Sequence, residues 1–177
     1  MQIRVTERGS ESFYRELVNI MSQYRKILQK PEGKLLDMFK VVKTYIGIAI
    51  AFLVLLVLMA IFWGGDLLTY VAIFMMVAII AYSIYLLYNL NALYKTYMND
   101  SGDSILTLDE DGIELDKENS TKVRLSWDKI AFARVYNESI TFIPKNITTY
   151  IICITRKYED EIVKYLVENK SDFRIYR

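Results

Sequence analysis

Histidine is absent from this 177-residue chain, and cysteine is present once, as Cys153. Without histidine there is no imidazole base, no Ser-His pair and no histidine metal site. A single cysteine excludes a thiolate-rich zinc site and an intrachain disulfide, as expected for a reducing compartment. No glycine-rich phosphate loop is present, and the carboxylates of residues 109–111 fall on a predicted exposed turn, where a shifted pKa is not expected. The composition therefore favours a protein that is not an enzyme and needs no cofactor.

Charge is absent from two long stretches, Tyr45 to Trp63 and Leu67 to Leu90, which contain no Asp, Glu, Lys or Arg. At about 1.5 Å per helical residue, each stretch can cross a hydrocarbon core of about 30 Å. Gly64-Gly65-Asp66 separates them and argues against one long buried helix. A cleaved secretory signal is rejected because a second span, rather than a mature domain, follows the first. The sequence predicts a two-span transmembrane hairpin over residues 45–97.

Basic residues flank the inner ends of the two predicted spans. Lys95 follows the second span, and the connecting turn has no basic residue. Six more precede the first span: Arg25, Lys26, Lys30, Lys34, Lys40 and Lys43. Basic residues concentrate on the cytoplasmic side of a membrane. We therefore expect a multi-pass cell-membrane protein with both termini in the cytoplasm.

Over the whole chain, 22 Lys and Arg nearly cancel 21 Asp and Glu, so no global field favours nucleic acid. Residues 1–44 nevertheless carry nine basic and five acidic groups, whereas residues 101–177 carry twelve and fourteen. The basic excess thus lies next to the membrane, where each Lys or Arg near anionic lipid gains about 1 kcal/mol. The six residues ahead of the first span are candidates for contact with lipid headgroups, although topology determination alone explains them equally well.

Residues 1–44 form the first predicted segment, with a helix over about Glu11 to Gln29 that is N-capped by Ser10. Its apolar stripe must pack on the C-terminal domain, on a second copy or on the bilayer surface, and packing on protein is favoured. Within the spans, Gly47-x-x-x-Ala51 and several alanines permit close helix approach, so a homodimer through the spans is a further hypothesis.

After Tyr97 the composition changes, and residues 101–177 show period-two alternation that predicts an antiparallel meander. A final helix over about Tyr158 to Asn169 closes this α+β domain. Residues 107–118 approach the spacing of an EF-hand calcium loop, but strand-like flanks favour a hairpin turn there. We expect no metal site. Trp127 and Ile130 are expected to anchor one strand end in the core.

Three segments after the spans resemble the YcxB-like family of bacterial membrane proteins: Glu110-Asp111-Gly112-Ile113, Leu125-Ser126-Trp127-Asp128-Lys129-Ile130 and Ile143-Pro144-Lys145. The resemblance covers roughly residues 40–170 and implies a cytosolic domain similar to a pleckstrin-homology (PH) partial barrel closed by the C-terminal helix. The family usually has Pro-Lys immediately before the last helix, whereas this chain has Ile152 to Lys157 there, which leaves the register of the last strands open. The resemblance implies no catalytic activity.

Strand alternation that places Leu125 inward turns Arg124 outward, and we expect Arg134 on the same side. With Lys129 these residues form a candidate cationic patch for binding a partner, against the simpler reading of an ordinary solvated face. The sequence thus favours a membrane-anchored, non-enzymatic binding or regulatory module at the inner leaflet, with the bilayer and a protein or peptide as partners. The alternative is a self-immunity protein that protects a bacterium against a secreted peptide toxin. A neighbouring toxin or exporter gene would favour the alternative.

Overall fold

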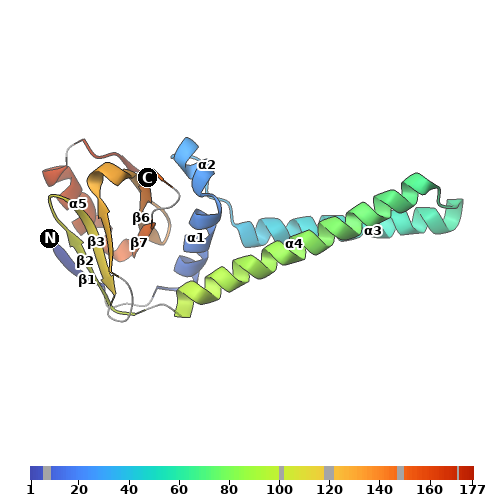
Figure 1. Cartoon of the computed structure of the whole chain (residues 1–177), viewed down its shortest axis with the longest axis horizontal. Helices are drawn as coiled ribbons and strands as arrows, with labels where there is room; N and C mark the ends of the chain where they lie inside the picture. The colour runs from blue at the N-terminus through green and yellow to red at the C-terminus, as the bar shows by residue number, and fades with distance from the viewer. Residues whose placement is uncertain (6–8, 100–101, 118–121, 147–149, 171) are drawn as a thin grey trace. The chain divides into compact units, whose positions relative to one another are not determined.

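The computed structural model describes residues 1–5, 9–99, 102–117, 122–146, 150–170 and 172–177. The chain divides into two compact units (Figure 1). Met1–Leu35 and Tyr94–Arg177 together form the first, here called the folded unit, and Leu36–Leu93 form the hairpin unit. The structure differs from the predicted division at residues 44 and 101, because the first 35 residues belong to the same unit as the C-terminal part of the chain.

Two long helices, α3 (Met38–Trp63) and α4 (Leu67–Asn99), account for the predicted spans. Asp37 caps α3 by accepting a 3.2 Å hydrogen bond from the Lys40 N–H. Gly64 has a φ of 79°, a left-handed conformation that favours glycine, and it ends α3. Asp66 accepts the Thr69 N–H at 2.8 Å as α4 begins. The turn over residues 64–66 is thus built from the residues that the sequence singled out.

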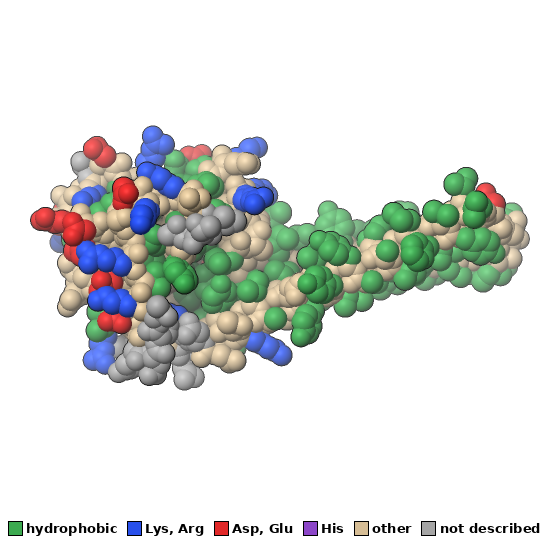
Figure 2. All heavy atoms as spheres, in the orientation of Figure 1, with side chains coloured by type: hydrophobic (Ala, Val, Ile, Leu, Met, Phe, Trp, Pro, Cys, Tyr) green, Lys and Arg blue, Asp and Glu red, His purple; other side chains and the backbone are tan. Residues whose placement is uncertain are grey.

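Both helices are long and apolar enough to cross a membrane, with mean hydropathies of 3.0 and 2.3 in their most apolar windows. Only 6% of each window is buried by the rest of the structure. Figure 2 shows apolar side chains along the outside of the pair. A core helix of a soluble protein would instead be buried, so these surfaces need an apolar environment that the chain itself does not supply.

Gly47, which the sequence suggested as a point of close helix approach, is open in this helix pair. A Cβ added at Gly47 would meet no atom within 4 Å, so Gly47 does not lie at a close contact in the single chain. Ala49 is buried instead. The homodimer stays a prediction.

The first sheet of the folded unit, sheet A, is antiparallel in the order β1-β2-β3-β4. Its strands are β1 (Gln2–Val5), β2 (Ser104–Leu108), β3 (Gly112–Lys117) and β4 (Val123–Ser126). The β2–β3 turn confirms the predicted hairpin. The edge strand β1 was not predicted, because four residues are too short for alternation to distinguish them from a loop.

Sheet B has the order β7-β6-β5-β8. Its strands are β5 (Ile130–Val135), β6 (Ser139–Pro144), β7 (Ile152–Thr155) and β8 (Ile175–Tyr176). The β8 strand, also unpredicted, pairs in parallel with β5 and makes this sheet mixed. A 3₁₀ turn, η1 (Trp127–Lys129), leads into β5, and a second, η2 (Arg156–Tyr158), leads into helix α5 (Glu159–Asn169). Among the described residues no strand pairing joins the two sheets into a closed barrel.

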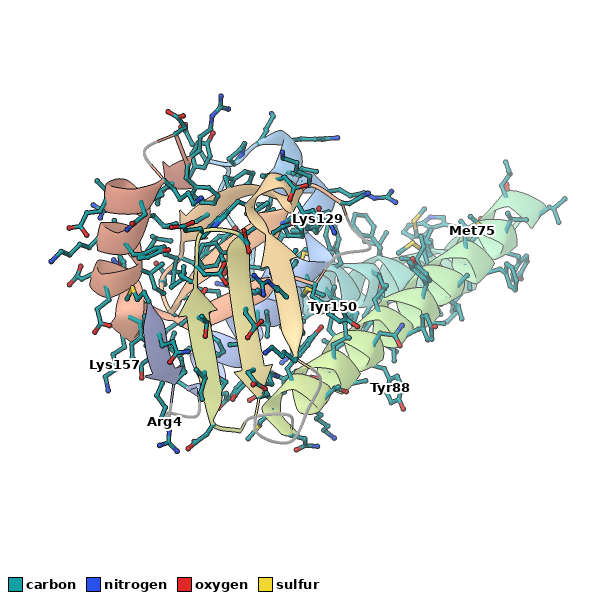
Figure 3. All side chains as sticks on the ribbon, turned by 60° about the vertical axis from the view of Figure 1, so that its left-hand side comes forward. Arg4, Met75, Tyr88, Lys129, Tyr150 and Lys157 are labelled. Atoms are coloured by element: carbon teal, nitrogen blue, oxygen red, sulfur yellow. The ribbon has the colours of Figure 1, made fainter. Side chains whose placement is uncertain are left out.

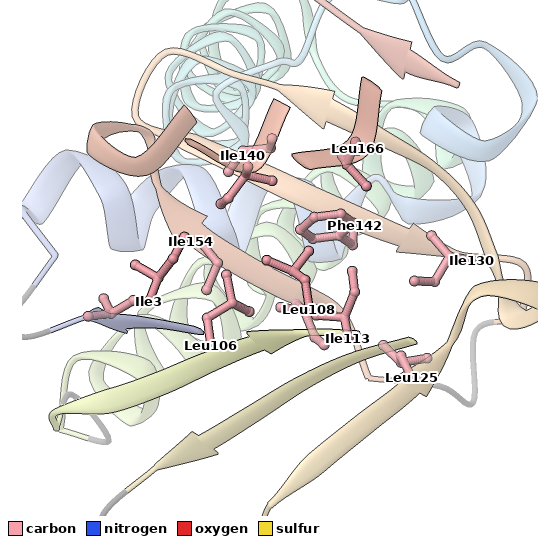
Figure 4. Packing of buried hydrophobic residues seen from close by; sticks show 14 of the residues in the cluster. Ile3, Leu106, Leu108, Ile113, Leu125, Ile130, Ile140, Phe142, Ile154 and Leu166 are labelled. Carbon is pink, nitrogen blue, oxygen red and sulfur yellow. The ribbon is translucent and has the colours of Figure 1, made fainter. Parts of the chain in front are cut away.

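The main core, called the central core, lies between the two sheets and α5 (Figure 4). Alternate residues of the facing strands fill it, including Leu106 and Leu108 from β2 and Ile140 and Phe142 from β6, all fully buried. Ile162 and Leu166 of α5 complete it, in agreement with the predicted helical stripe. Trp127 only packs against this core, and it is partly buried in η1 rather than at its centre.

Two helices, α1 (Glu11–Ser22) and α2 (Tyr24–Gln29), pack against sheet B, on the side away from α5 (Figure 1). Ser10 caps α1 by accepting the Phe13 N–H at 3.1 Å, as predicted. The predicted single helix is interrupted at Gln23, which separates α1 from α2. Their apolar side chains form a second cluster with those of sheet B: Ile20, Tyr24, Ile27, Phe132, Tyr136 and Ile143. Packing on protein, the favoured alternative, is confirmed.

Candidate functional site

The three residues of the predicted cationic patch lie in different settings. Arg124 is exposed on β4 of sheet A, and its guanidinium lies 3.1 Å from a carboxylate oxygen of Asp109 and 3.3 Å from one of Asp111. A third carboxylate, Glu114, is 3.7 Å away. The charge of Arg124 is therefore neutralised locally, and this residue does not contribute a free cationic surface.

Arg134 is buried, with 7% of its surface exposed, so the prediction that it points outward was wrong. The prediction assumed that one face of its strand meets solvent. Every residue of β5 except Ala131 is buried, because the central core covers one side of sheet B and α1 and α2 cover the other. The Arg134 guanidinium lies 4.7 Å from the centre of the Tyr136 ring, and its Nε and Nη1 have no hydrogen-bond partner in the described structure.

A row of polar side chains lies on sheet B beneath α1. Glu16 of α1, itself buried, accepts a 2.6 Å hydrogen bond from the Ser139 hydroxyl and the Glu138 N–H at 3.2 Å. The Ser139 hydroxyl lies 3.2 Å from that of Thr141, which in turn lies 3.2 Å from the Cys153 sulfur. We call Glu16, Ser139, Thr141 and Cys153 the polar row. It links α1 to β6 and β7 by hydrogen bonds.

Burial raises the pKa values of the titratable groups in and beside this row. Desolvation raises the pKa of Glu16, although the hydrogen bonds from Ser139 and Glu138 oppose it. Desolvation also raises the pKa of the Cys153 thiol to about 11 and that of Tyr136 to about 12, the latter against the opposing charge of Arg134. A thiol with such a pKa is not a nucleophile at neutral pH. The row therefore suits a structural connection. No local sequence pattern predicts it, because Glu16 and Ser139 are 123 residues apart.

Lys129, the third predicted patch residue, lies with a different set of residues. Its carbonyl accepts the Lys145 N–H at 2.8 Å, at the ends of β5 and β6. Pro144 precedes Lys145 in the chain, and its carbonyl accepts a 2.5 Å hydrogen bond from the Tyr24 hydroxyl of α2. We call Arg25, Lys26, Lys129 and Lys145, which are all exposed, the basic rim. Lys145 was not among the predicted site residues, because only the contact with Tyr24 brings it next to α2.

The remaining candidates for headgroup contact are exposed as well. Lys30 and Lys34 follow α2 in the folded unit, whereas Lys40 and Lys43 lie on α3 in the hairpin unit. Contact of any of the six with lipid headgroups stays a prediction.

The EF-hand-like segment is a hairpin turn in the structure. The Asp109 carboxylate accepts the N–H groups of Asp111 at 2.9 Å and Gly112 at 2.8 Å, and these bonds, chiefly that from Gly112, lower its pKa. The Trp127 indole N–H donates to the Asp109 carbonyl at 3.0 Å. In the described part of the chain no group of three or more acidic or cysteine side chains is arranged to hold a metal ion.

Searches for relatives of this chain found no matching protein family, no matching curated protein and no matching solved structure.

Proposed function

We propose that this protein is a membrane-anchored, non-enzymatic binding or regulatory module. In this proposal, α3 and α4 cross the cell membrane, and the folded unit lies at the inner leaflet as a PH-like domain of the YcxB-like type. The observation that carries the proposal is the pair of apolar helices, each only 6% buried in its most apolar window, joined to a separately packed unit of two sheets and three helices. The inner-leaflet orientation is supported by the basic residues before α3 and the absence of any in the 64–66 turn.

A binding role fits the chemistry of the folded unit better than catalysis. The chain has no histidine, and burial raises the pKa values of the Cys153 and Tyr136 side chains further above neutral pH. Within the spans there is no ionisable side chain of the kind that marks a transport pathway. The fold instead presents exposed charged surfaces around a closed core.

Site-specific photocrosslinking in native membranes tests the binding role. A photoreactive residue replaces Asn146, beside the basic rim, or Glu168, which is exposed on α5, in the full chain. We expect the photoreactive residue at position 146 to form more crosslinked product than the one at position 168. Equal background labelling at both positions, or a measurable catalytic turnover by the purified chain, would contradict the proposal.

A further inference from the structure

We infer that the basic rim docks on the anionic phospholipid headgroups of the bilayer that holds the chain's own helices. The inference deepens the proposed function and depends on it for the position of the folded unit. It also moves Lys129 out of the predicted patch with Arg124 and Arg134 and pairs it with Lys145 and α2.

The rim is assembled by tertiary contacts between segments more than 100 residues apart. The Tyr24 hydroxyl holds the first turn of α2 against the Pro144 carbonyl, and the Lys145 N–H to Lys129 carbonyl bond joins the two strand ends. Tyr24 and Ile27 are buried against sheet B, so α2 turns its apolar face inward while Arg25 and Lys26 stay exposed. In Figure 3, Lys129 lies on the α2 side of the folded unit, whereas Arg4 and Lys157 lie toward β1 and α5.

Among the described residues, the cations of the rim are not paired with carboxylates, in contrast to several cations of sheet A and of η2. None of the four rim side chains forms a salt bridge to a carboxylate among the described residues. Elsewhere in the folded unit, carboxylates lie within salt-bridge distance of Arg4, Lys122, Arg124, Arg156 and Arg177.

Two acids lie close to the rim in the chain. Asp128 precedes Lys129, and its pKa is lowered first by the Ser126 side chain and to a smaller degree by Lys129 and Lys145. Glu32 is exposed after α2, between Lys30 and Lys34. Six cations over the rim and the segment that follows α2 thus face two carboxylates, and the net charge there is positive.

The position of α2 and the basic residues that follow it, directly before α3 in the chain, favours lipid as the molecule that the rim binds. Only residues 35–37 separate Lys34 from the first residue of α3, and a tether this short gives nearby headgroups a high effective concentration. A basic cluster directly cytoplasmic of a span is the sequence arrangement that attracts anionic lipid. Tyr150, which is 69% exposed, precedes Ile151 of the second apolar cluster and offers the amphipathic ring typical of membrane interfaces.

Energy transfer in nanodiscs tests the inference with the full chain. Asn146→Cys, in a Cys153→Ser background, carries the donor dye, and headgroup-labelled lipid is the acceptor. Nanodiscs contain either phosphatidylcholine alone or phosphatidylcholine with phosphatidylglycerol. We expect strong transfer only with phosphatidylglycerol, and a loss of transfer at high salt because the attraction is screened.

The matched variants are Lys129→Gln with Lys145→Gln, and Lys157→Gln with Lys164→Gln on the η2–α5 side. At about fivefold per lysine, the first pair should lower the docking constant roughly 25-fold, and the second pair less than twofold. Lys129→Arg with Lys145→Arg should keep the transfer, which separates loss of charge from misfolding.

Equal transfer in both kinds of nanodisc, or an equal loss in the two glutamine pairs, would overturn the inference. The absence of energy transfer in both kinds of nanodisc would also overturn it. This includes the case in which position 146 crosslinks to an acidic protein in cells. The two leaflets of a nanodisc are alike, so the result does not depend on orientation in the cell. A wrong topology and a wrong docking surface therefore give separate outcomes.

Discussion

The two sides of sheet B bury their residues in different ways. Toward the central core, Ala133, Ile140, Phe142 and Ile154 pack in one apolar cluster with residues of sheet A and α5. Toward α1 and α2, apolar contacts alternate with the polar row and with the buried Arg134. The first side resembles an ordinary domain core, whereas the second is a layer in which hydrogen bonds fix where a helix lies. We therefore expect the two sides to respond differently to mutation.

The largest effect is expected from Phe142→Ala, at the centre of the central core. Removing a fully buried phenylalanine should lower the free energy of unfolding by about 3 to 5 kcal/mol. Chemical denaturation of the detergent-solubilised full chain measures this change. If Phe142→Ala lowers the free energy of unfolding by less than a surface substitution does, the central core is not the main source of stability.

A smaller effect, confined to the helix layer, is expected from Glu16→Ala. It leaves the Glu138 N–H without its acceptor, at a cost of about 1 to 3 kcal/mol. Cys153 is partly exposed and is connected to α1 through Thr141 and Ser139, so it should react faster with a thiol reagent when α1 is released, by roughly 5- to 30-fold for a loss of about 1 to 2 kcal/mol. The matched control is Glu11→Ala, an exposed change on the same helix that removes only a 3.7 Å pair with Arg15. Equal labelling rates in both variants would contradict a locking role for Glu16.

The pH dependence of stability should carry the signature of Glu16. Burial raises its pKa in the folded state, so the folded chain binds the proton more tightly than the unfolded chain. The contribution of this group is therefore most favourable below its unfolded pKa near 4.5 and is lost as the pH rises through the folded value. Glu16→Gln should flatten that part of the stability profile, which begins near pH 4.5 and extends upward. If the stabilities of the unmodified chain and of Glu16→Gln instead change in parallel with pH, Glu16 is not desolvated.

The smallest effect is expected from Arg124→Gln on sheet A. Its ion pairs are exposed, and such pairs contribute about 0 to 1 kcal/mol. The same denaturation assay should show a change near its error. A loss comparable to that of Glu16→Ala would mean that the Arg124 network is structural after all.

Much of the fold follows from local patterns. The charge-free runs predict α3 and α4, alternation predicts β2 to β7 approximately, and helical spacing predicts α5 and the inward face of α1. The strands β1 and β8 escape such reasoning because each is short and exists only through its pairing with a distant strand. The outward placement of Arg134 failed for a related reason. Alternation shows which residues share a face, but not whether a helix from another part of the chain covers that face.

The candidate surfaces show the same limit. Sequence proximity suggested Arg124 with Lys129, but the chain crosses from sheet A to sheet B between them. Lys145 joins Lys129 through one backbone hydrogen bond, and α2 joins both through Tyr24. Neither contact has a local sequence signal.

The position of the folded unit relative to the membrane is the central claim, and reporter fusions test it most directly. Alkaline phosphatase, which is active only outside the cytoplasm, and a fluorescent protein that matures inside it are fused in parallel at Gly65 and at Lys95. The account predicts phosphatase activity at Gly65 alone and fluorescence at Lys95 alone, because basic residues flank both inner helix ends. An active phosphatase at Lys95 with a silent one at Gly65 would contradict the account.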